Sequence, residues 1–338
     1  MEIILILPIM ISFVLCLAIL PKWIKKCKEV GLLWEDMNKF RHPKNVAASG
    51  GIIMVMAFVI GVLSYIAIRT FLLENNSEIA IKVFSLLAVI LILAIVGLTD
   101  DLLGWKNGGL SAKFRVFLAL FASIPLIVIN AGQHTISLPL IGRFDLYWIY
   151  PAILIPIGVA GATTTYNFLA GFNGLESGQG IIILTFLSFI AYSTGTSWLA
   201  LIGMIMTAVL IAFYYYNKFP AKVFPGDILT YTIGAMIACM AILGNFEKIA
   251  LFVFLPYIIE TILKIGRGKM KKYSFGLPDK NGNLRMPYDR VYGLTHLSIL
   301  ILSKFKKEVK EKDVVYFIFS FQIVLCLFSL LIFKNSLF

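Results

Sequence analysis

The run IAIKVFSLLAVILILAIVGL at residues 79–98 is followed at once by TDDLLG at residues 99–104. An apolar run of this length can cross the ~30 Å hydrocarbon core of a bilayer as a single helix. Asp100 and Asp101 then stand where that span meets water. Ionisable groups at a membrane boundary are expensive to keep, so their default interpretation is functional. The pair predicts a site that holds a divalent cation or a metal-bound phosphate.

Composition extends this interpretation to the whole chain. Of its 338 residues, 59% are hydrophobic and only 14% are charged, so a water-soluble globule would expose a very large apolar surface. The sequence predicts an all-α integral membrane protein, a single polytopic domain over residues 1–338, with about ten transmembrane helices and with its active site in cytoplasmic loops. The predicted spans lie near residues 2–20, 46–69, 79–98, 112–130, 148–168, 179–195, 198–216, 228–244, 247–265 and 313–333.

The distribution of basic residues predicts the orientation. Lysine and arginine accumulate in cytoplasmic loops of membrane proteins, and 25 of the 30 in this chain fall in the connections 21–45, 99–115, 217–227 and 264–312. This bias places both termini outside the cytoplasm and predicts a multi-pass protein of the cell membrane. The net charge of +12 is then explained by orientation and by contact with anionic lipid headgroups. Nucleic acid is not an expected partner.

The long cytoplasmic connection 266–312 contains a second apolar element. Residues 291–303 form an apolar stretch that is too short to cross a bilayer, and lysines follow at positions 304, 306, 307, 310 and 312. This pattern is typical of an amphipathic helix that lies in the membrane interface. Such a helix would let a lipid-borne substrate approach the site from the side.

Two further cytoplasmic segments are dense in polar residues. Residues 166–180, YNFLAGFNGLESGQG, contain the turn dipeptide Asn173-Gly174, which a plain hairpin connection would explain. The density of amides and glycines favours a backbone that comes close to a ligand with a base or a sugar. Residues 220–227, PAKVFPGD, end where a span begins, so Asp227 is either a helix N-cap or a hard oxygen ligand for Mg²⁺. Phe224 would offer a stacking face to a nucleobase.

Other features of the chain have plainer interpretations. Residues 104–113 contain a Gly/Asn turn, and Ser111 can cap the helix that follows. Residues 41–44, RHPK, fit an orienting basic cluster ahead of the SGG at residues 49–51. The four cysteines have no C-x-x-C spacing and the three histidines are far apart. Neither a zinc or redox centre nor a histidine-rich metal site is therefore expected.

Four of these motifs, in this order, resemble those of the polyprenyl-phosphate hexosamine-1-phosphate transferases, a family of ten-span membrane enzymes. The pair Asp100-Asp101 is similar to the family's paired aspartates, and GLSAK at residues 109–113 is similar to the segment downstream of that pair in the bacterial branch. Residues 167–179 resemble the Asn-x-x-x-Gly-x-Asn-Gly-Leu-Glu-x-Gly-Gln signature of the dolichol branch, and VFPGD at residues 223–227 resembles the Val-Phe-x-Gly-Asp motif. The resemblance covers residues 38–227 and weakens after residue 268.

The resemblance implies roles for individual residues. Asp227 and Asn167 would hold Mg²⁺, with Mn²⁺ as an alternative, together with a substrate diphosphate. Asp100, Asp101, Asp227 and Lys113 would form the catalytic group, with the doublet near an acceptor phosphate and Lys113 on a phosphate. The implied substrate-binding residues are Phe224 and Asn173 at a uracil, then Gly171, Glu176 and Lys44, and finally Arg285, Arg290 and His296, which would replace an Arg/His-rich stretch that is absent from the last cytoplasmic connection.

The implied activity is the transfer of a hexosamine-1-phosphate from a UDP-sugar to a polyprenyl or dolichyl phosphate, and the dolichol-branch motif favours UDP-GlcNAc. The products would be a polyprenyl-diphosphate sugar and UMP, in the first membrane step of glycan assembly, and family members commonly form homodimers. Physical chemistry agrees, because both reactants are anions and their approach requires a cation and basic side chains. A lipid phosphate with a second pKa of about 6 is already mostly ionised, so a general base is not obligatory.

Two other classes of protein stay open at this point. A secondary transporter or ion channel would also place carboxylates in a multi-span bundle, but near the bilayer midplane and often in the broken helices of an internal repeat. Here the carboxylates lie at span ends on one side, and no half-to-half repeat is detectable. A protein that binds a polyprenyl-linked sugar without converting it would share the sequence features of the enzyme.

Overall fold

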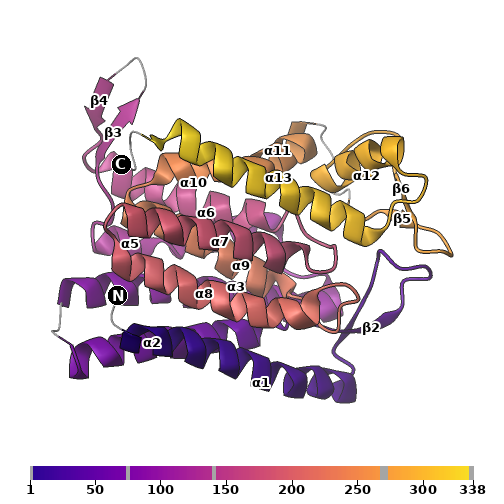
Figure 1. Ribbon diagram of the computed structural model, residues 1–338, viewed down its shortest axis with the longest axis horizontal. Helices are drawn as coiled ribbons and strands as arrows, with labels where there is room; N and C mark the ends of the chain where they lie inside the picture. Colours follow the sequence, from indigo (N-terminus) through magenta and orange to yellow (C-terminus); the bar gives the residue numbers. More distant parts are fainter. Residues whose placement is uncertain (1–2, 74–76, 139–141, 267–272, 335–338) are drawn as a thin grey trace.

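The computed structural model describes residues 3–73, 77–138, 142–266 and 273–334, and most of them are helical. The long helices lie side by side in a bundle (Figure 1). Within the described ranges, seven helices are long and apolar enough to cross a membrane, or eight if α10 (Glu247–Val253) and α11 (Leu255–Gly266), which meet at 60°, form one bent span. The seven are α1 (Leu7–Val30), α2 (Gly51–Phe71), α3 (Ser77–Asn107), α7 (Leu175–Ser193), α8 (Ser197–Asn217), α9 (Gly226–Gly244) and α13 (Glu311–Ile332).

The two remaining predicted spans are occupied by shorter pieces of helix. α4 (Ala112–Phe121) and α5 (Ile124–Val128) fall within residues 112–130, and the short π-helix η2 (Tyr150–Leu154) and α6 (Ile155–Tyr166) fall within residues 148–168. None of these four pieces alone is long enough to cross a bilayer. The mostly helical, multi-pass membrane class is therefore confirmed, whereas the number of ten spans stays a prediction.

Several predicted boundaries are wrong. α1 continues past residue 20 to Val30. α3 continues past Leu98 to Asn107, so Asp100 and Asp101 lie within a helix and not in the loop that follows it. The helix can continue because these carboxylates find partners in neighbouring segments. The second span begins at Gly51, because the residues before it form the strand β2 (Lys44–Ala47), which pairs with β1 (Leu33–Glu35).

The remaining elements are short. The described part of the chain begins with the 3₁₀ turn η1 (Ile3–Ile6). Two further antiparallel ribbons pair β3 (Thr135–Leu138) with β4 (Gly142–Asp145) and β5 (Leu277–Pro278) with β6 (Leu284–Arg285). The apolar stretch of the last long connection forms α12 (Leu294–Phe305), which packs against α11 and α13. Its predicted place in the membrane interface is not tested by these contacts.

Helix α9 is the centre of the bundle. It packs against α2, α3, α6, α7 and α8, and nearly every residue along it is buried. Its closest neighbours approach at glycines: a Cβ at Gly97 of α3 would lie 2.6 Å from the Cα of Ile228, and one at Gly234 of α9 would lie 2.6 Å from the carbonyl oxygen of Ala162 in α6. α9 is therefore held tightly between α3, which touches its start, and α6, which touches its middle.

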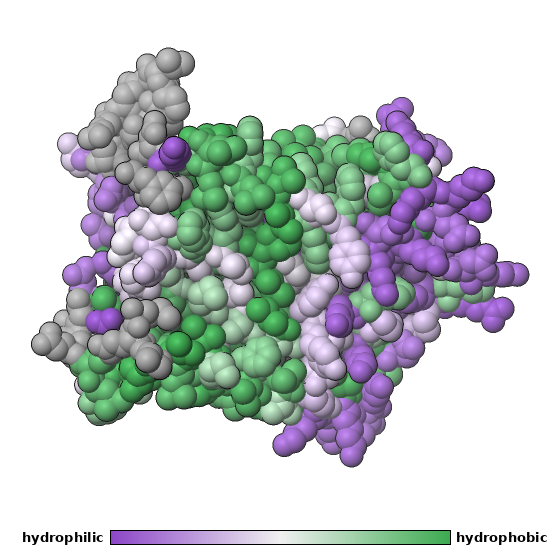
Figure 2. All heavy atoms as spheres, viewed as in Figure 1, coloured by the Kyte–Doolittle hydropathy of each residue, from purple (hydrophilic) through white to green (hydrophobic). Residues whose placement is uncertain are grey.

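The surface of the bundle is polarised along the helices. Figure 2 shows a broad apolar surface over the middle of the molecule and a concentration of hydrophilic side chains at one end. That end carries β2, β5 and β6, whereas both chain termini lie at the opposite end (Figure 1). An apolar belt with one strongly polar end is the surface expected of a protein embedded in a bilayer.

The close approach at Gly97 generates a test. Gly97→Ala should force α3 and α9 apart and lower the free energy of unfolding by about 1–3 kcal/mol, which is measured as a lower thermal unfolding temperature in detergent. Gly158→Ala in α6 is the matched control, because its Cβ would meet nothing within 4 Å and alanine is the better helix former. Equal unfolding temperatures for the two variants would contradict the packing argument.

Candidate active site

One large cavity collects side chains from segments that are far apart in the sequence. Its volume is about 950 Å³, and it is lined by parts of α3, α4, α9 and α11, by the turn that follows α6, and by residues 273–275. Seven of the residues singled out from the sequence line it: Asp100, Asp101, Asn167, Gly171, Glu176, Phe224 and Asp227.

The second aspartate of the doublet fixes the start of α9. The backbone N–H of Asp227 donates a hydrogen bond of 2.7 Å to Oδ1 of Asp101. Gly226 has a φ of +71°, and a Cβ there would lie 2.0 Å from Oδ2 of Asp101, so a side chain at this position has no room. Asp101 therefore caps α9 from another helix, where a carboxylate also interacts favourably with the helix dipole.

The other two carboxylates share one guanidinium. Nη1 of Arg115, in α4, lies 2.8 Å from Oδ2 of Asp100 and 3.1 Å from Oδ2 of Asp227. The backbone N–H of Leu110 donates to Oδ1 of Asp100, and Gly109, with a φ of +75°, leaves space for that carboxylate. Sequence reasoning did not single out Arg115. The signal was present, because an arginine at the start of an apolar run is costly unless it has partners.

The turn after α6 brings further polar groups to the same cavity. Asn167 is the residue that ends α6. Gly171, with a φ of +107°, donates its N–H to Oε1 of Glu176 at 2.7 Å, while Oε2 of this buried carboxyl has no partner among the described residues. The backbone of Phe224 is held by Ala47, whose carbonyl accepts its N–H at 2.8 Å, and by Gly50, whose N–H donates to its carbonyl at 2.9 Å.

Two of the predicted substrate-binding residues are buried outside the cavity. Asn173 does not line the cavity. It joins segments that are distant in the sequence, because its N–H donates to Glu311 at 2.7 Å and its Nδ2 donates to Asp36 at 3.1 Å. His296 lies against backbone, with Nε2 3.2 Å from the carbonyl oxygen of Phe275. Burial lowers the pKa of His296 below its usual value, so the ring is neutral at pH 7.

The remaining predicted residues also lie away from the cavity wall. Lys44, Lys113 and Arg290 are exposed and do not line it. Arg285, in β6, lines a second and smaller cavity of about 260 Å³ together with Asp279 and Lys307. The structure thus brings the aspartates, Asn167 and Phe224 together, and none of the five basic residues that the sequence had suggested lines their cavity.

The donor atoms fit Mg²⁺ under one condition. Within the part of the chain that the structure describes, no three His, Cys, Asp or Glu side chains converge to hold a metal ion by themselves. Mg²⁺, however, is usually bound by one or two carboxylates together with substrate phosphates and water. Asp227 and the amide oxygen of Asn167 line the same cavity and are hard oxygen donors of the kind that Mg²⁺ and Mn²⁺ accept. The site fits such a cation if a phosphorylated substrate completes the ligand set.

Comparison with known proteins relates this arrangement to one family. The profile described as glycosyl transferase family 4 matches residues 83–245. A protein from Saccharolobus solfataricus assigned as a UDP-N-acetylglucosamine–dolichyl-phosphate N-acetylglucosaminephosphotransferase is 34% identical over 303 residues, which is 89% of each chain. The chain belongs to glycosyl transferase family 4. The residues matched by the family profile extend from α3 to α9 and so include the three aspartates, Arg115 and the turn after α6.

Other members of the family show how wide this similarity is. A Sulfolobus acidocaldarius protein with the same assigned name is 34% identical over 304 residues, again 89% of each chain. The phospho-N-acetylmuramoyl-pentapeptide-transferase of Streptococcus agalactiae is 29% identical over 280 residues, which is 79% of this chain and 82% of its own. Similarity thus extends to relatives named for a dolichyl-phosphate acceptor and to relatives named for a phospho-N-acetylmuramoyl-pentapeptide.

The shared guanidinium predicts a difference between two basic residues of α4. Arg115→Met should leave Asp100 and Asp227 facing each other without a cation, and we expect it to lower the free energy of unfolding by about 1–3 kcal/mol. Lys113→Met, at an exposed position, should change it by less than about 0.5 kcal/mol. Thermal unfolding in detergent compares the two. An equal loss in both variants would show that Arg115 has no special contact with the carboxylates.

Proposed function

We propose that the cavity transfers N-acetylglucosamine-1-phosphate from UDP-N-acetylglucosamine to a polyprenyl or dolichyl phosphate. The observation that carries the proposal is the convergence of Asp100, Asp227, Asn167 and Arg115 in one cavity of a membrane-embedded helix bundle. A water-soluble sugar nucleotide and a lipid phosphate can meet only where water and lipid adjoin. The names of the family members support the same two substrates.

The reaction is an exchange of phosphate bonds. An oxygen of the lipid phosphate attacks the phosphorus that carries the sugar, and the bond from that phosphorus to the phosphate oxygen of UMP breaks. UMP leaves with that oxygen, and the lipid keeps a diphosphate linked to the sugar. Because the attacking phosphate is already mostly ionised at neutral pH, no residue has to remove a proton from it.

The residues of the cavity then act by positioning and by charge. Asp227 and Asn167 would hold Mg²⁺, which supplies the positive charge that lets two anions approach each other. Asp100, fixed by Arg115 and by the Leu110 N–H, is an oriented acceptor near the reacting groups, and Asp101 holds Asp227 in place. The ring of Phe224 would stack on the uracil, since it lines the cavity on a backbone held from both sides.

The membrane arrangement belongs to the same proposal. The hydrophilic end of the bundle faces the cytoplasm, where UDP-sugars are available, and both termini lie on the other side. The short helices α4, α5, η2 and α6 complete ten crossings, and α12 lies in the interface so that the lipid substrate can enter sideways. A homodimer is the expected assembly.

Release of UMP tests the activity and Asp227 together. The purified protein should release UMP from UDP-N-acetylglucosamine only when a polyprenyl phosphate and Mg²⁺ are both present. Asp227→Asn should reduce the rate by a factor of about a hundred or more, because the amide is a weaker ligand for a hard cation. The matched control is Asp145→Asn, an exposed position at the opposite end of the bundle. UMP release without polyprenyl phosphate would contradict the transfer, as would transport of the sugar nucleotide without cleavage.

The stacking role of Phe224 predicts a selective effect on one substrate. Stacking of an aromatic ring on a base contributes about 1–3 kcal/mol, so Phe224→Ala should raise the KM for UDP-N-acetylglucosamine about tenfold or more and leave the KM for the polyprenyl phosphate unchanged. Phe71→Ala, at the end of α2 and at a residue that is 83% exposed, is the control. Equal changes in both KM values would remove the stacking role.

A further inference from the structure

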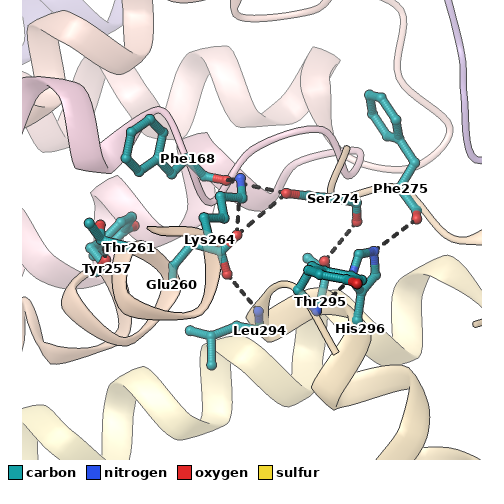
Figure 3. A network of polar contacts seen from close by, with 11 residues as sticks. Phe168, Tyr257, Glu260, Thr261, Lys264, Ser274, Phe275, Leu294, Thr295 and His296 are labelled. Atoms are coloured by element: carbon teal, nitrogen blue, oxygen red, sulfur yellow. Dashed lines mark hydrogen bonds and ion pairs between the residues drawn. The ribbon is translucent and has the colours of Figure 1, made fainter. Parts of the chain in front are cut away.

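A buried ion pair lies beside the cavity, on helix α11, which meets α10 at 60°. Glu260 and Lys264 are one helical turn apart, their residues are 0% and 8% exposed, and Nζ lies 3.1 Å from Oε1 (Figure 3). Lys264 lines the cavity. The pair lies outside the residues matched by the family profile, and no step of the proposed reaction uses it.

Lys264 holds the turn that carries Asn167. Its ammonium donates a hydrogen bond of 2.5 Å to the backbone carbonyl of Phe168, the residue that follows Asn167. The hydroxyl of Ser274 lies 3.3 Å from the same carbonyl oxygen. Carbonyls at the end of a helix have no partner within it and interact favourably with a cation. The end of α6 is thus fixed by side chains from two segments that are distant in the sequence.

Glu260 holds the start of α12 and the segment that contains Ser274. Its Oε2 accepts the N–H of Leu294 in the first turn of α12, and a Cβ at Gly293 would lie only 2.7 Å from its Oε1. The hydroxyl of Thr295 donates to the carbonyl of Ser274 at 2.7 Å, which closes the network (Figure 3). One ion pair therefore joins the end of α6, residues 273–275 and the start of α12.

A contribution to stability does not explain this pair well. Removing two charges from water costs about as much as their attraction returns, so a buried ion pair seldom stabilises a fold more than apolar residues of the same size would. What the pair does supply is a fixed arrangement, because the two charged groups together form hydrogen bonds with three segments: Lys264 with the carbonyl of Phe168, and Glu260 with the hydroxyl of Ser274 and the N–H of Leu294.

We propose that Glu260 and Lys264 are positioning residues for Asn167. By fixing the carbonyl of Phe168, the ion pair sets the place from which the Asn167 amide meets the metal and the diphosphate. This inference rests on the proposed function. Partners that orient the ligands of a metal typically change its affinity by about 10- to 100-fold when they are removed.

The test uses a variant that removes both charges at once. Lys264→Met alone leaves Glu260 buried without a cation and should destabilise the fold, whereas Glu260→Gln with Lys264→Met leaves no charge unpaired and keeps an acceptor for the Leu294 N–H. The thermal unfolding temperature of the full-length protein is measured with UDP-N-acetylglucosamine while MgCl₂ is titrated. The Mg²⁺ concentration for half of the ligand-induced stabilisation should rise about tenfold or more.

Two further variants make the result specific. Lys306→Met with Asp313→Asn removes an ion pair of 2.6 Å whose lysine is largely exposed, and it should leave the Mg²⁺ requirement unchanged. Asn167→Ala should raise the requirement, and adding the Glu260/Lys264 changes to it should then have little further effect, because both act through one group.

The possible outcomes distinguish a failure of the positioning role from a failure of the proposed transferase function. An unchanged Mg²⁺ requirement in the Glu260/Lys264 variant, or effects that add fully to those of Asn167→Ala, would overturn the positioning role and leave the transferase proposal intact. A wild-type protein that shows neither Mg²⁺-dependent stabilisation by UDP-N-acetylglucosamine nor UMP release would overturn both.

Discussion

Where α3 crosses α9, a carboxylate of one helix accepts a backbone N–H from the first turn of the other. This bond joins Asp101 to Asp227, and one turn earlier on α3 the absence of a side chain at Gly97 lets the two backbones touch. Because α9 is enclosed by its neighbours, its start cannot shift without moving them. The position of Asp227 relative to Asp100 and Arg115 follows from this one contact.

The sequence predicts that this chain lies in a membrane more accurately than it predicts where each helix ends. Apolar runs of membrane-crossing length are a local property, and the seven long helices lie where such runs were found. A boundary depends on what surrounds a polar residue. Asp100 looked like the end of a span because a carboxylate in lipid is costly, but Arg115 and the Leu110 N–H satisfy it inside the bundle, so α3 continues. Both partners lie beyond the end of α3, so the apolar run alone does not show that the helix continues.

The residues of the candidate site also fall into two groups: those that sequence motifs reveal and those that only the tertiary structure reveals. Asp100, Asp227, Asn167 and Phe224 belong to compact motifs, and motifs were enough to find them. Asn173 belongs to one of those motifs too, yet its partner Glu311 comes from the last helix of the described chain, and only tertiary structure shows that it joins segments instead of facing the cavity. Lys264 was missed for the complementary reason, since a lone lysine near the end of a span looks like any orienting charge.

The charge of the site gives a physical reason for the cation dependence that we propose. Two carboxylates, Asp100 of α3 and Asp227 of α9, share the Arg115 guanidinium, and Asp101 adds a third carboxylate beside them. The cavity therefore repels a diphosphate and a lipid phosphate unless positive charge is added. A purely basic cavity would bind both anions tightly but would also retain the products, whose charges are similar. An acidic site that binds anions through a cation avoids this, because the cation can enter and leave with the leaving nucleotide. Within the proposed function, the acidic doublet and the single arginine thus favour turnover over tight binding.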